Sequence, residues 1–289
     1  MQELPGSILL FYLMIEQFEH PDWLYYRHDN WRGIVRQGWE ELLGDPGSLG
    51  KQGQSVNDKP DRMVRRWESP LGNVYIKHIY SPNSFSERLL TYAKNRLRPP
   101  RSLQVWHISE ALLEEGLRCP KPLLGAFNYS LFGLDSEEFL VSAEIAHPLL
   151  NKRLNNSSSA AEIAELLAAA GKGIRLLHDK GFVHGDCLPG NMCIDPENNL
   201  YFLDNDRTAR LSLLGARRER LRNLVQFASR ALPLLPDNTT IDDFVQAYYL
   251  QDQRRNAIIE KEQQEFMRML ELRLRQLERE IGRKLPTLK

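Results

Sequence analysis

Short apolar segments separated by turn residues occupy much of the first half of the chain, a pattern typical of β-strands. Segments at 63–67 and 74–79 flank a turn at 69–73, and together they predict a β-hairpin. Two further strands are expected at 123–129 and 138–145. The first half of the chain is therefore predicted to be rich in β-structure.

Apolar residues at helical spacing predict a helix over 102–115, which ends at Gly116 because glycine accepts a positive φ. A serine-rich break at 155–159 is suited to cap a long helix over 160–179. The chain from residue 212 onward is predicted to be helical. Strands come mainly before helices in this order, which favours the α+β fold class.

The same order predicts two lobes joined by a hinge near 143–150. An apolar and then aromatic leader at 1–30 precedes a β-rich N-lobe at 31–145, and the leader is a candidate for contact with a membrane interface. A helical C-lobe follows at 146–289, with a short strand–turn–strand element at 183–204.

Composition places the chain among globular proteins, because 42% of its 289 residues are hydrophobic and 26% are charged. Lys plus Arg and Asp plus Glu both number 38, so net charge identifies no partner. The cysteines, Cys119, Cys187 and Cys193, form no CxxC pair, which argues against a disulfide framework or a structural zinc site. The longest apolar run, at 8–15, is too short to span a bilayer and lacks the basic segment of a signal peptide, so we predict a cytoplasmic protein.

Three oxygen-bearing side chains in the strand–turn–strand region indicate chemistry. Asp186 and Asn191 lie five residues apart, and Asp204 follows after a stretch long enough for a hairpin that would bring Asn191 and Asp204 to one end. Transfer of a phosphoryl group needs a carboxylate that accepts the proton of the attacking hydroxyl, a role that suits Asp186. It also needs oxygen ligands for Mg²⁺, a role that suits Asn191 and Asp204.

A lysine inside an apolar strand supplies the fourth candidate, Lys77 within Val74-Tyr-Ile-Lys-His78. A lysine in such a position needs a partner for its ammonium group. The order Lys, His-x-Asp-x-x-x-x-Asn and Asp is the pattern of the protein-kinase fold, here with His-Gly-Asp at 184–186.

With these residues in place, the chain resembles the bacterial lipopolysaccharide kinases, which modify the Kdo and heptose sugars of the inner core. The residues that carry the resemblance lie at 74–80, at 112–122, and at 176–186 continuing to 202–207. It covers roughly 60–235 and leaves the leader and the C-terminal tail outside.

The resemblance implies a two-lobed protein-kinase-like fold, the cofactors ATP and Mg²⁺, and a sugar hydroxyl on a lipid-linked glycan as acceptor. It implies that Lys77 binds the ATP phosphates, that Asp186 is the base, and that Asn191 and Asp204 hold the metal. His184 is expected to be a structural residue of the catalytic loop. Such an enzyme would work in the cytoplasm, peripherally at the inner membrane.

Several positions depart from the protein-kinase pattern. Asn205 and Asp206 replace the Phe-Gly that follows the metal-binding Asp, so a Phe-driven activation switch is not expected. Glu110 is the candidate partner for Lys77, with a solvated helix position as the alternative. The loop that covers ATP is either 44–53 or the turn at Gly72, because no clean GxGxxG is present.

Charge and amphipathic pattern leave two surface questions open. Seven arginines against one acid at 207–230 fit either an anionic substrate or membrane surface, or a solvated helix face. The apolar stripe of the tail at 260–285 either packs on the C-lobe or forms a coiled coil or a membrane-interface helix. No nucleic-acid-binding module is recognisable, so no nucleic-acid partner is expected.

Three functions remain after these observations. The first is an ATP-dependent kinase of a lipopolysaccharide core sugar. The second is a kinase of a small soluble molecule, which the His-Gly-Asp form suggests. The third is a pseudokinase that acts as a binding module, which the unclear glutamate and glycine loop suggest but the four candidate residues oppose.

Overall fold

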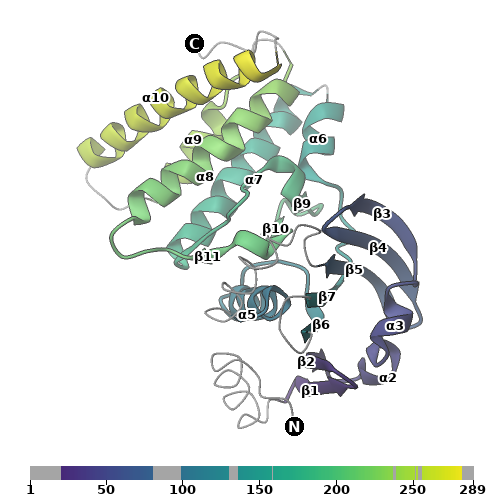
Figure 1. The fold of residues 1–289 in the computed structure, drawn as a ribbon. Helices are drawn as coiled ribbons and strands as arrows, with labels where there is room; N and C mark the ends of the chain where they lie inside the picture. The colour runs from purple at the N-terminus through teal and green to yellow at the C-terminus, as the bar shows by residue number, and fades with distance from the viewer. Residues whose placement is uncertain are drawn as a thin grey trace. The chain divides into compact units, whose positions relative to one another are not determined.

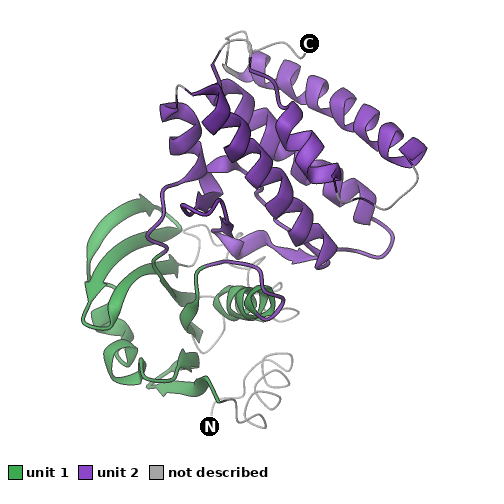
Figure 2. Cartoon of the chain, turned by 180° about the vertical axis from the view of Figure 1, so that it is seen from behind, with its two compact units in different colours: residues 1–113, 120–144 green, residues 114–119, 145–289 purple. Residues whose placement is uncertain are grey.

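The computed structural model describes residues 21–80, 99–129, 136–157, 159–236, 239–250, 252 and 256–281. The apolar run at 8–15 and the end of the predicted tail lie outside this part of the chain. The chain divides into two compact units (Figure 2), which are described separately: unit 1 holds residues 1–113 and 120–144, and unit 2 holds residues 114–119 and 145–289.

Unit 1 is built on an antiparallel sheet of seven strands in the order β1-β2-β6-β7-β5-β4-β3 (Figure 1). The predicted hairpin is confirmed as β4–β5, and the two further predicted strands are confirmed as β6 and β7. The strands are β1 Trp23–His28, β2 Trp31–Arg36, β3 Gln54–Lys59, β4 Arg62–Ser69, β5 Gly72–Tyr80, β6 Pro122–Tyr129 and β7 Ser136–Ala143.

Three strands of this sheet were not predicted from the sequence. The strand β1 lies within the stretch assigned to the leader, and it pairs with β2 over its whole length. The strand β3 is exposed along its entire length, so it carries no apolar alternation for a pattern to reveal.

Each face of the sheet has its own core, as the alternation of strand side chains requires. One face packs on two short helices, α2 (Glu40–Leu43) and α3 (Pro46–Leu49), which bury Leu43 and Leu49 against the sheet. On the other face Leu103 and Trp106 of helix α5 (Arg101–Glu114) pack on Ile34 and Phe127.

Specific residues define both ends of helix α5. The carboxylate of Glu138 on β7 accepts a hydrogen bond of 2.6 Å from the backbone N–H of Ser102, in the first turn, where free N–H groups favour an anion. Gly116, just beyond the helix, has φ +76°, which confirms the predicted stop.

Unit 2 is mainly helical. Its long helix α7 begins at an N-cap, Ser159, whose side chain accepts from the N–H of Glu162, and it ends before Gly181. A Cβ at Gly171 would lie 2.4 Å from the carbonyl oxygen of Phe244, so this glycine allows α9 to pack closely on α7. The helices are α6 Leu150–Asn156, α7 Ala160–Asp179, α8 Ala216–Ala231, α9 Asp242–Tyr249 and α10 Asn256–Ile281, with a 3-10 turn η3 at Leu232–Leu234.

The amphipathic tail forms α10, which lies along α8 (Figure 1). Its stripe, namely Phe266, Leu270, Leu274 and Leu277, is buried inside unit 2. The structure therefore selects packing on the helical unit over the coiled-coil and membrane-interface alternatives for this stripe. Among the described residues, no helix combines the length and the hydropathy needed to cross a bilayer.

Candidate active site

The strand–turn–strand element of unit 2 places the three candidate side chains around one hydrogen-bonded loop. Strand β8 (Phe182–Val183) leads into the loop, and the hairpin β9 (Met192–Ile194) and β10 (Leu200–Phe202) leads out of it, with a 3-10 turn η1 at Pro189–Asn191. The side-chain amide of Asn191 donates to the backbone oxygen of Asp186 at 3.0 Å. The N–H of Leu203 donates to the oxygen of Asn191 at 2.8 Å, so the hairpin brings Asn191 beside the residue that precedes Asp204.

Asp204 begins the 3-10 turn η2 (Asn205–Arg207) in a left-handed conformation, with φ 51° and ψ 59°. A residue with a Cβ rarely adopts this conformation, and it persists only where surrounding contacts hold it. The contact next to it is a 2.7 Å hydrogen bond between the ring Nε2 of His184 and the oxygen of Leu203.

His184 is fully buried and joins the loop to the end of β10. Its Nδ1 accepts from the N–H of Asp186 at 3.3 Å, which leaves Nε2 as the donor to Leu203. Burial lowers the pKa of His184, so the ring stays neutral in this tautomer. The structural role expected for this histidine agrees with these contacts.

Steric crowding explains why the middle residue of His-Gly-Asp is glycine. A Cβ at Gly185 would lie 2.0 Å from the Cβ of Arg207 and 2.3 Å from its carbonyl oxygen, closer than any real contact. The guanidinium Nη1 of Arg207 lies 3.5 Å from Oδ1 of Asp186, and both side chains are partly exposed. Asp186 therefore faces solvent beside a cation, in a position that an incoming hydroxyl can reach.

Asn223 of α8 is a residue of this site that sequence reasoning missed. It is 2% exposed, its Oδ1 accepts from the N–H of His184 at 2.9 Å, and its Nδ2 donates to the oxygen of His184 at 2.7 Å. Arg222 of the same helix donates to the oxygen of Gly185 at 3.1 Å. The signal in the sequence was a single amide between Leu221 and Leu224, both buried on the core side of the helix.

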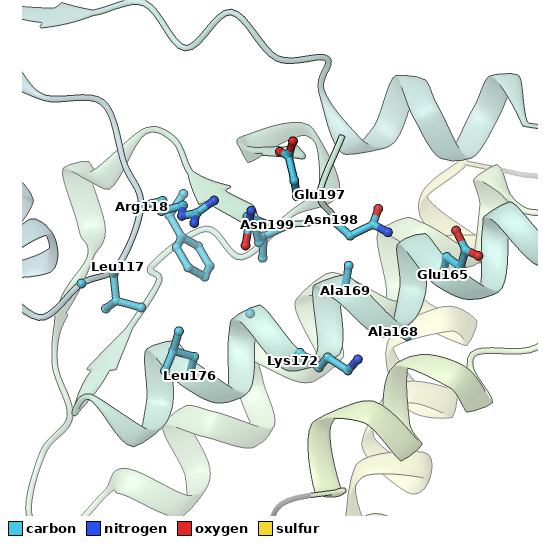
Figure 3. A pocket seen from close by; sticks show the side chains of 14 residues that line it. Leu117, Arg118, Glu165, Ala168, Ala169, Lys172, Leu176, Glu197, Asn198 and Asn199 are labelled. Carbon is cyan, nitrogen blue, oxygen red and sulfur yellow. The ribbon is translucent and has the colours of Figure 1, made fainter. Parts of the chain in front are cut away.

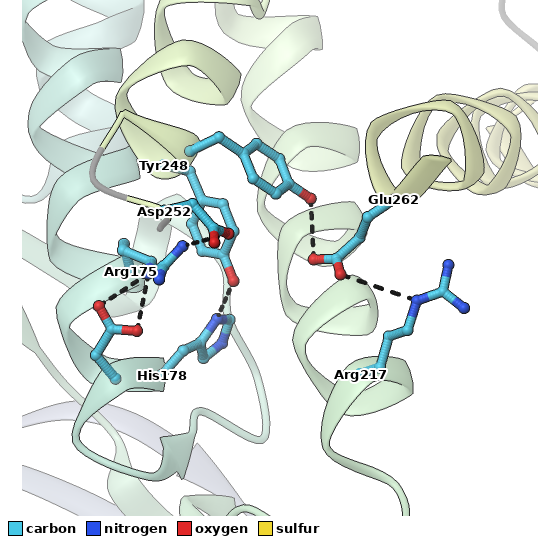
Figure 4. Close-up of polar contacts among 8 residues, drawn as sticks. Arg175, His178, Arg217, Tyr248, Asp252 and Glu262 are labelled. Atoms are coloured by element: carbon cyan, nitrogen blue, oxygen red, sulfur yellow. Dashed lines mark hydrogen bonds and ion pairs between the residues drawn. The ribbon is translucent and has the colours of Figure 1, made fainter. Parts of the chain in front are cut away.

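A buried histidine on α7 contacts that amide, because Nε2 of His178 lies 3.2 Å from Oδ1 of Asn223. Nδ1 of His178 lies 2.8 Å from the hydroxyl of Tyr248 on α9 (Figure 4). One turn earlier, Arg175 binds the carboxylates of Asp179 and Asp252. A series of hydrogen bonds therefore connects Tyr248 of α9, His178 of α7 and Asn223 of α8 to the loop that holds Asp186.

The free energy of unfolding should depend on pH through His178. Burial lowers its pKa to about 3 from 6.5, so between these values the unfolded chain binds a proton that the folded chain does not. Stability is therefore fully present above pH 6.5 and decreases as the pH falls, by about 2 kcal/mol at pH 5 from this group alone.

Urea unfolding of the wild type and of His178→Gln, followed by circular dichroism at neutral pH and near pH 5, measures this effect. The variant should lose less stability on acidification than the wild type. His28→Gln, which changes an exposed histidine of unit 1, is the matched control and should keep the wild-type dependence. Equal dependence in all three proteins would contradict the buried neutral state of His178.

The three cysteines of the chain are shielded from solvent. All are reduced and buried, including Cys187 directly after Asp186. Burial raises the pKa of Cys187 and raises that of Cys193 to about 11, so thiolate is scarce at neutral pH.

In unit 1, Lys77 lies on β5, an interior strand between β4 and β7. It is opposite Leu140, which is opposite Gly125, so the three share one face of the sheet. A Cβ at Gly125 would lie 3.1 Å from the oxygen of Ser102, which identifies this face as the one that α5 covers. The strand position predicted for Lys77 is thus observed.

Glu110 was expected to pair with Lys77, but the structure gives it another partner. Its carboxylate pairs with Nη2 of Arg36, a buried side chain that also donates to the oxygen of Pro122 at 3.2 Å. A guanidinium that is buried needs a carboxylate to compensate its charge, which explains the pairing of Arg36 with Glu110.

Neither of the two glycine segments proposed to cover ATP lies in the hairpin that precedes the lysine strand. The segment 44–53 contains α3 and contributes Leu49 to the core, and Gly72 lies in the turn between β4 and β5. The hairpin that precedes the lysine strand is β3–β4, whose turn holds Pro60 and Asp61 and contains no glycine.

A separate pocket of about 510 Å³ opens on another part of unit 2 (Figure 3). It lies between α7, the segment Gly116–Arg118 and the turn of the β9–β10 hairpin. Its lining combines Lys172, Glu165 and Asn198 with apolar side chains, and the three candidate side chains of the catalytic loop are not part of it. The pocket is therefore distinct from the place where the three candidate residues lie.

Comparison with known proteins agrees with this geometry. The model of the lipopolysaccharide kinase (Kdo/WaaP) family matches residues 47–269. A solved structure described as WaaP in complex with acyl carrier protein is similar in fold, with a TM-score of 0.55 and 15% sequence identity over 82% of this chain and 99% of that one. No curated protein matches the sequence. Because the family model covers well over half of the sequence, the chain belongs to the lipopolysaccharide kinase (Kdo/WaaP) family.

Proposed function

We propose that this kinase transfers the γ-phosphoryl group of ATP to a hydroxyl of a Kdo or heptose sugar in the lipopolysaccharide inner core. Membership of the family makes the protein a phosphotransferase that acts on a sugar hydroxyl. The observation that carries the assignment of residues is the loop in which Asn191 binds the backbone of Asp186 and adjoins the residue before Asp204.

In this proposal Asp186 orients the acceptor hydroxyl and takes its proton as the oxygen attacks phosphorus. The bond between the γ-phosphorus and the bridging oxygen breaks, and ADP leaves. The partly exposed carboxylate is accessible to a hydroxyl, and Arg207 beside it is suited to meet a phosphate group of the acceptor.

Asn191 and Asp204 are the proposed ligands of Mg²⁺, and their donor atoms fit that ion. The amide nitrogen of Asn191 is used on Asp186, which leaves its oxygen for a cation. Mg²⁺ at a kinase site is usually held by one or two side-chain oxygens together with nucleotide phosphates, which agrees with two protein ligands. When bound, the metal would neutralise charge on the phosphates.

We also propose that unit 1 is the N-lobe and unit 2 the C-lobe of a protein-kinase-like fold. The lysine on an interior strand of unit 1 supports this, because Lys77 then has the role of binding the α- and β-phosphates. The β3–β4 turn replaces the expected glycine-rich segments as the candidate to cover ATP.

The acceptor is the part of the proposal that most needs an experiment. ATP turnover with Mg²⁺ is measured with and without deacylated inner-core oligosaccharide. Turnover that depends on the oligosaccharide supports a core-sugar kinase. Turnover with an unrelated water-soluble acceptor would favour a small-molecule kinase. Binding of Mg²⁺-ATP without turnover would indicate a different acceptor, and neither binding nor turnover would favour a pseudokinase.

A further inference from the structure

Two neighbouring leucines after β11 (Ala209–Arg210) point fully into solvent. Leu213 is 102% exposed and Leu214 is 104% exposed, whereas Leu250, the next most exposed large apolar residue of the described chain, is 73% exposed. Exposed single leucines are ordinary, but a pair of adjacent leucines without any cover is not.

The exposure results from a turn that hydrogen bonds hold in shape. The carboxylate of Glu219 accepts from both the N–H and the hydroxyl of Ser212 at 2.9 Å. The hydroxyl oxygen of Ser212 in turn accepts from the N–H of Gly215 at 2.9 Å. The turn begins where the N–H of Leu211 donates to the oxygen of Gly181 at 2.8 Å. Hydrogen bonds hold the backbone before and after the two leucines, so the shape of the turn directs their side chains into solvent.

The chain on both sides of this pair is rich in arginine, although Arg207 lies beside Asp186 and Arg217 pairs with Glu262 and Glu265. From Arg207 to Arg218 the chain carries four arginines and no acidic residue. Arg218 is exposed, Arg210 lies over the ring of Phe182, and Arg217 pairs with Glu265 at the edge of α10. The acid that follows, Glu219, is already bound by Ser212.

We propose that this leucine turn, residues 211–215, inserts into the headgroup region of an anionic phospholipid bilayer. Two apolar side chains flanked by arginines match such a surface, because apolar insertion and attraction to lipid phosphates add together. Two leucines alone bury far too little area for a stable protein interface, which usually takes about 800 Å² on each partner.

The position of the turn gives the insertion a use, and this step rests on the proposed function. The turn follows η2 closely in sequence, and η2 carries Arg207, whose guanidinium lies 3.5 Å from Asp186. Docking through Leu213 and Leu214 would hold the catalytic loop close to the membrane surface, where a lipid-linked sugar presents its hydroxyl.

The test is co-sedimentation of the full chain with vesicles of phosphatidylethanolamine, with and without phosphatidylglycerol, in the absence of ATP and acceptor. The wild type should bind the vesicles that contain phosphatidylglycerol. The double variant Leu213→Ser/Leu214→Ser should bind about tenfold more weakly, and Arg218→Gln about fivefold more weakly. Leu250→Ser is the matched control and should bind as the wild type does.

No binding by the wild type, or equal binding by the double variant, would overturn the proposal. Sedimentation velocity without lipid tests the alternative that the turn binds a second copy of the chain. A dimer that the double variant abolishes would assign the turn to that interface. Turnover with deacylated oligosaccharide should be unchanged in the double variant. Failure of vesicle binding is thus separate from failure of the kinase assignment.

Discussion

Asp186→Asn should lower the turnover number for phosphoryl transfer by about 10²–10⁴-fold, because the amide cannot accept the proton of the acceptor hydroxyl. The change removes a charge but keeps the size of the side chain. The backbone oxygen of Asp186, which accepts from Asn191, is untouched. Binding of Mg²⁺-ATP should therefore remain close to that of the wild type.

Steady-state kinetics with deacylated inner-core oligosaccharide as acceptor, together with ATP titration, measures both quantities. Glu197→Gln is the matched control, since it neutralises an exposed carboxylate in the turn of the same β9–β10 hairpin. A variant with wild-type turnover would remove Asp186 from the role of base. A variant that loses ATP binding and turnover together would place Asp186 in nucleotide binding instead.

Asn223→Ala should lower the free energy of unfolding by about 2–5 kcal/mol and also reduce turnover. The substitution leaves the buried N–H and C=O of His184 without partners, and each unsatisfied group costs about 1–3 kcal/mol. His178 loses its contact with Oδ1 as well. Because His184 adjoins Gly185 and Asp186, loosening it should displace the base.

Chemical denaturation and kinetics of the variant separate the two effects. Gln226→Ala, one turn further along α8, is the control. Its amide contacts the oxygen of Gly185 and Nδ2 of Asn223 only at 3.4 Å, so its loss should change stability by less than about 1 kcal/mol. If Asn223→Ala has the wild-type free energy of unfolding, the hydrogen bonds between Asn223 and the backbone of His184 do not stabilise the fold. If it is less stable but fully active when folded, Asn223 has no positioning role.

The candidate residues that could be predicted from the sequence are those whose roles depend on local order along the chain. Asp186, Asn191 and Asp204 lie on one loop and one hairpin, so spacing alone brings them close. Lys77 could be predicted because the apolar residues around it indicate a strand. The roles of these four residues remain predictions for the experiments above.

Contacts between distant segments could not be read in the same way. Asn223 lies 39 residues from His184, and its place between two buried leucines does not identify that partner. Glu110 was assigned by its place on a helix, but Arg36 on β2, 74 residues away, pairs with it. Neither pair shows any signal until the sheet and helices have packed.

The sequence by itself determined the family, the two kinds of secondary structure and the hairpin that bears the candidate residues, because these depend on periodicity and short spacings. Only the tertiary structure decided which helix holds the loop, which acid meets which base, and that Leu213 and Leu214 are exposed while the tail stripe is buried. The physical reason is that burial and pairing are properties of surfaces brought together from distant parts of the chain, and a local pattern does not name the surface that will cover it.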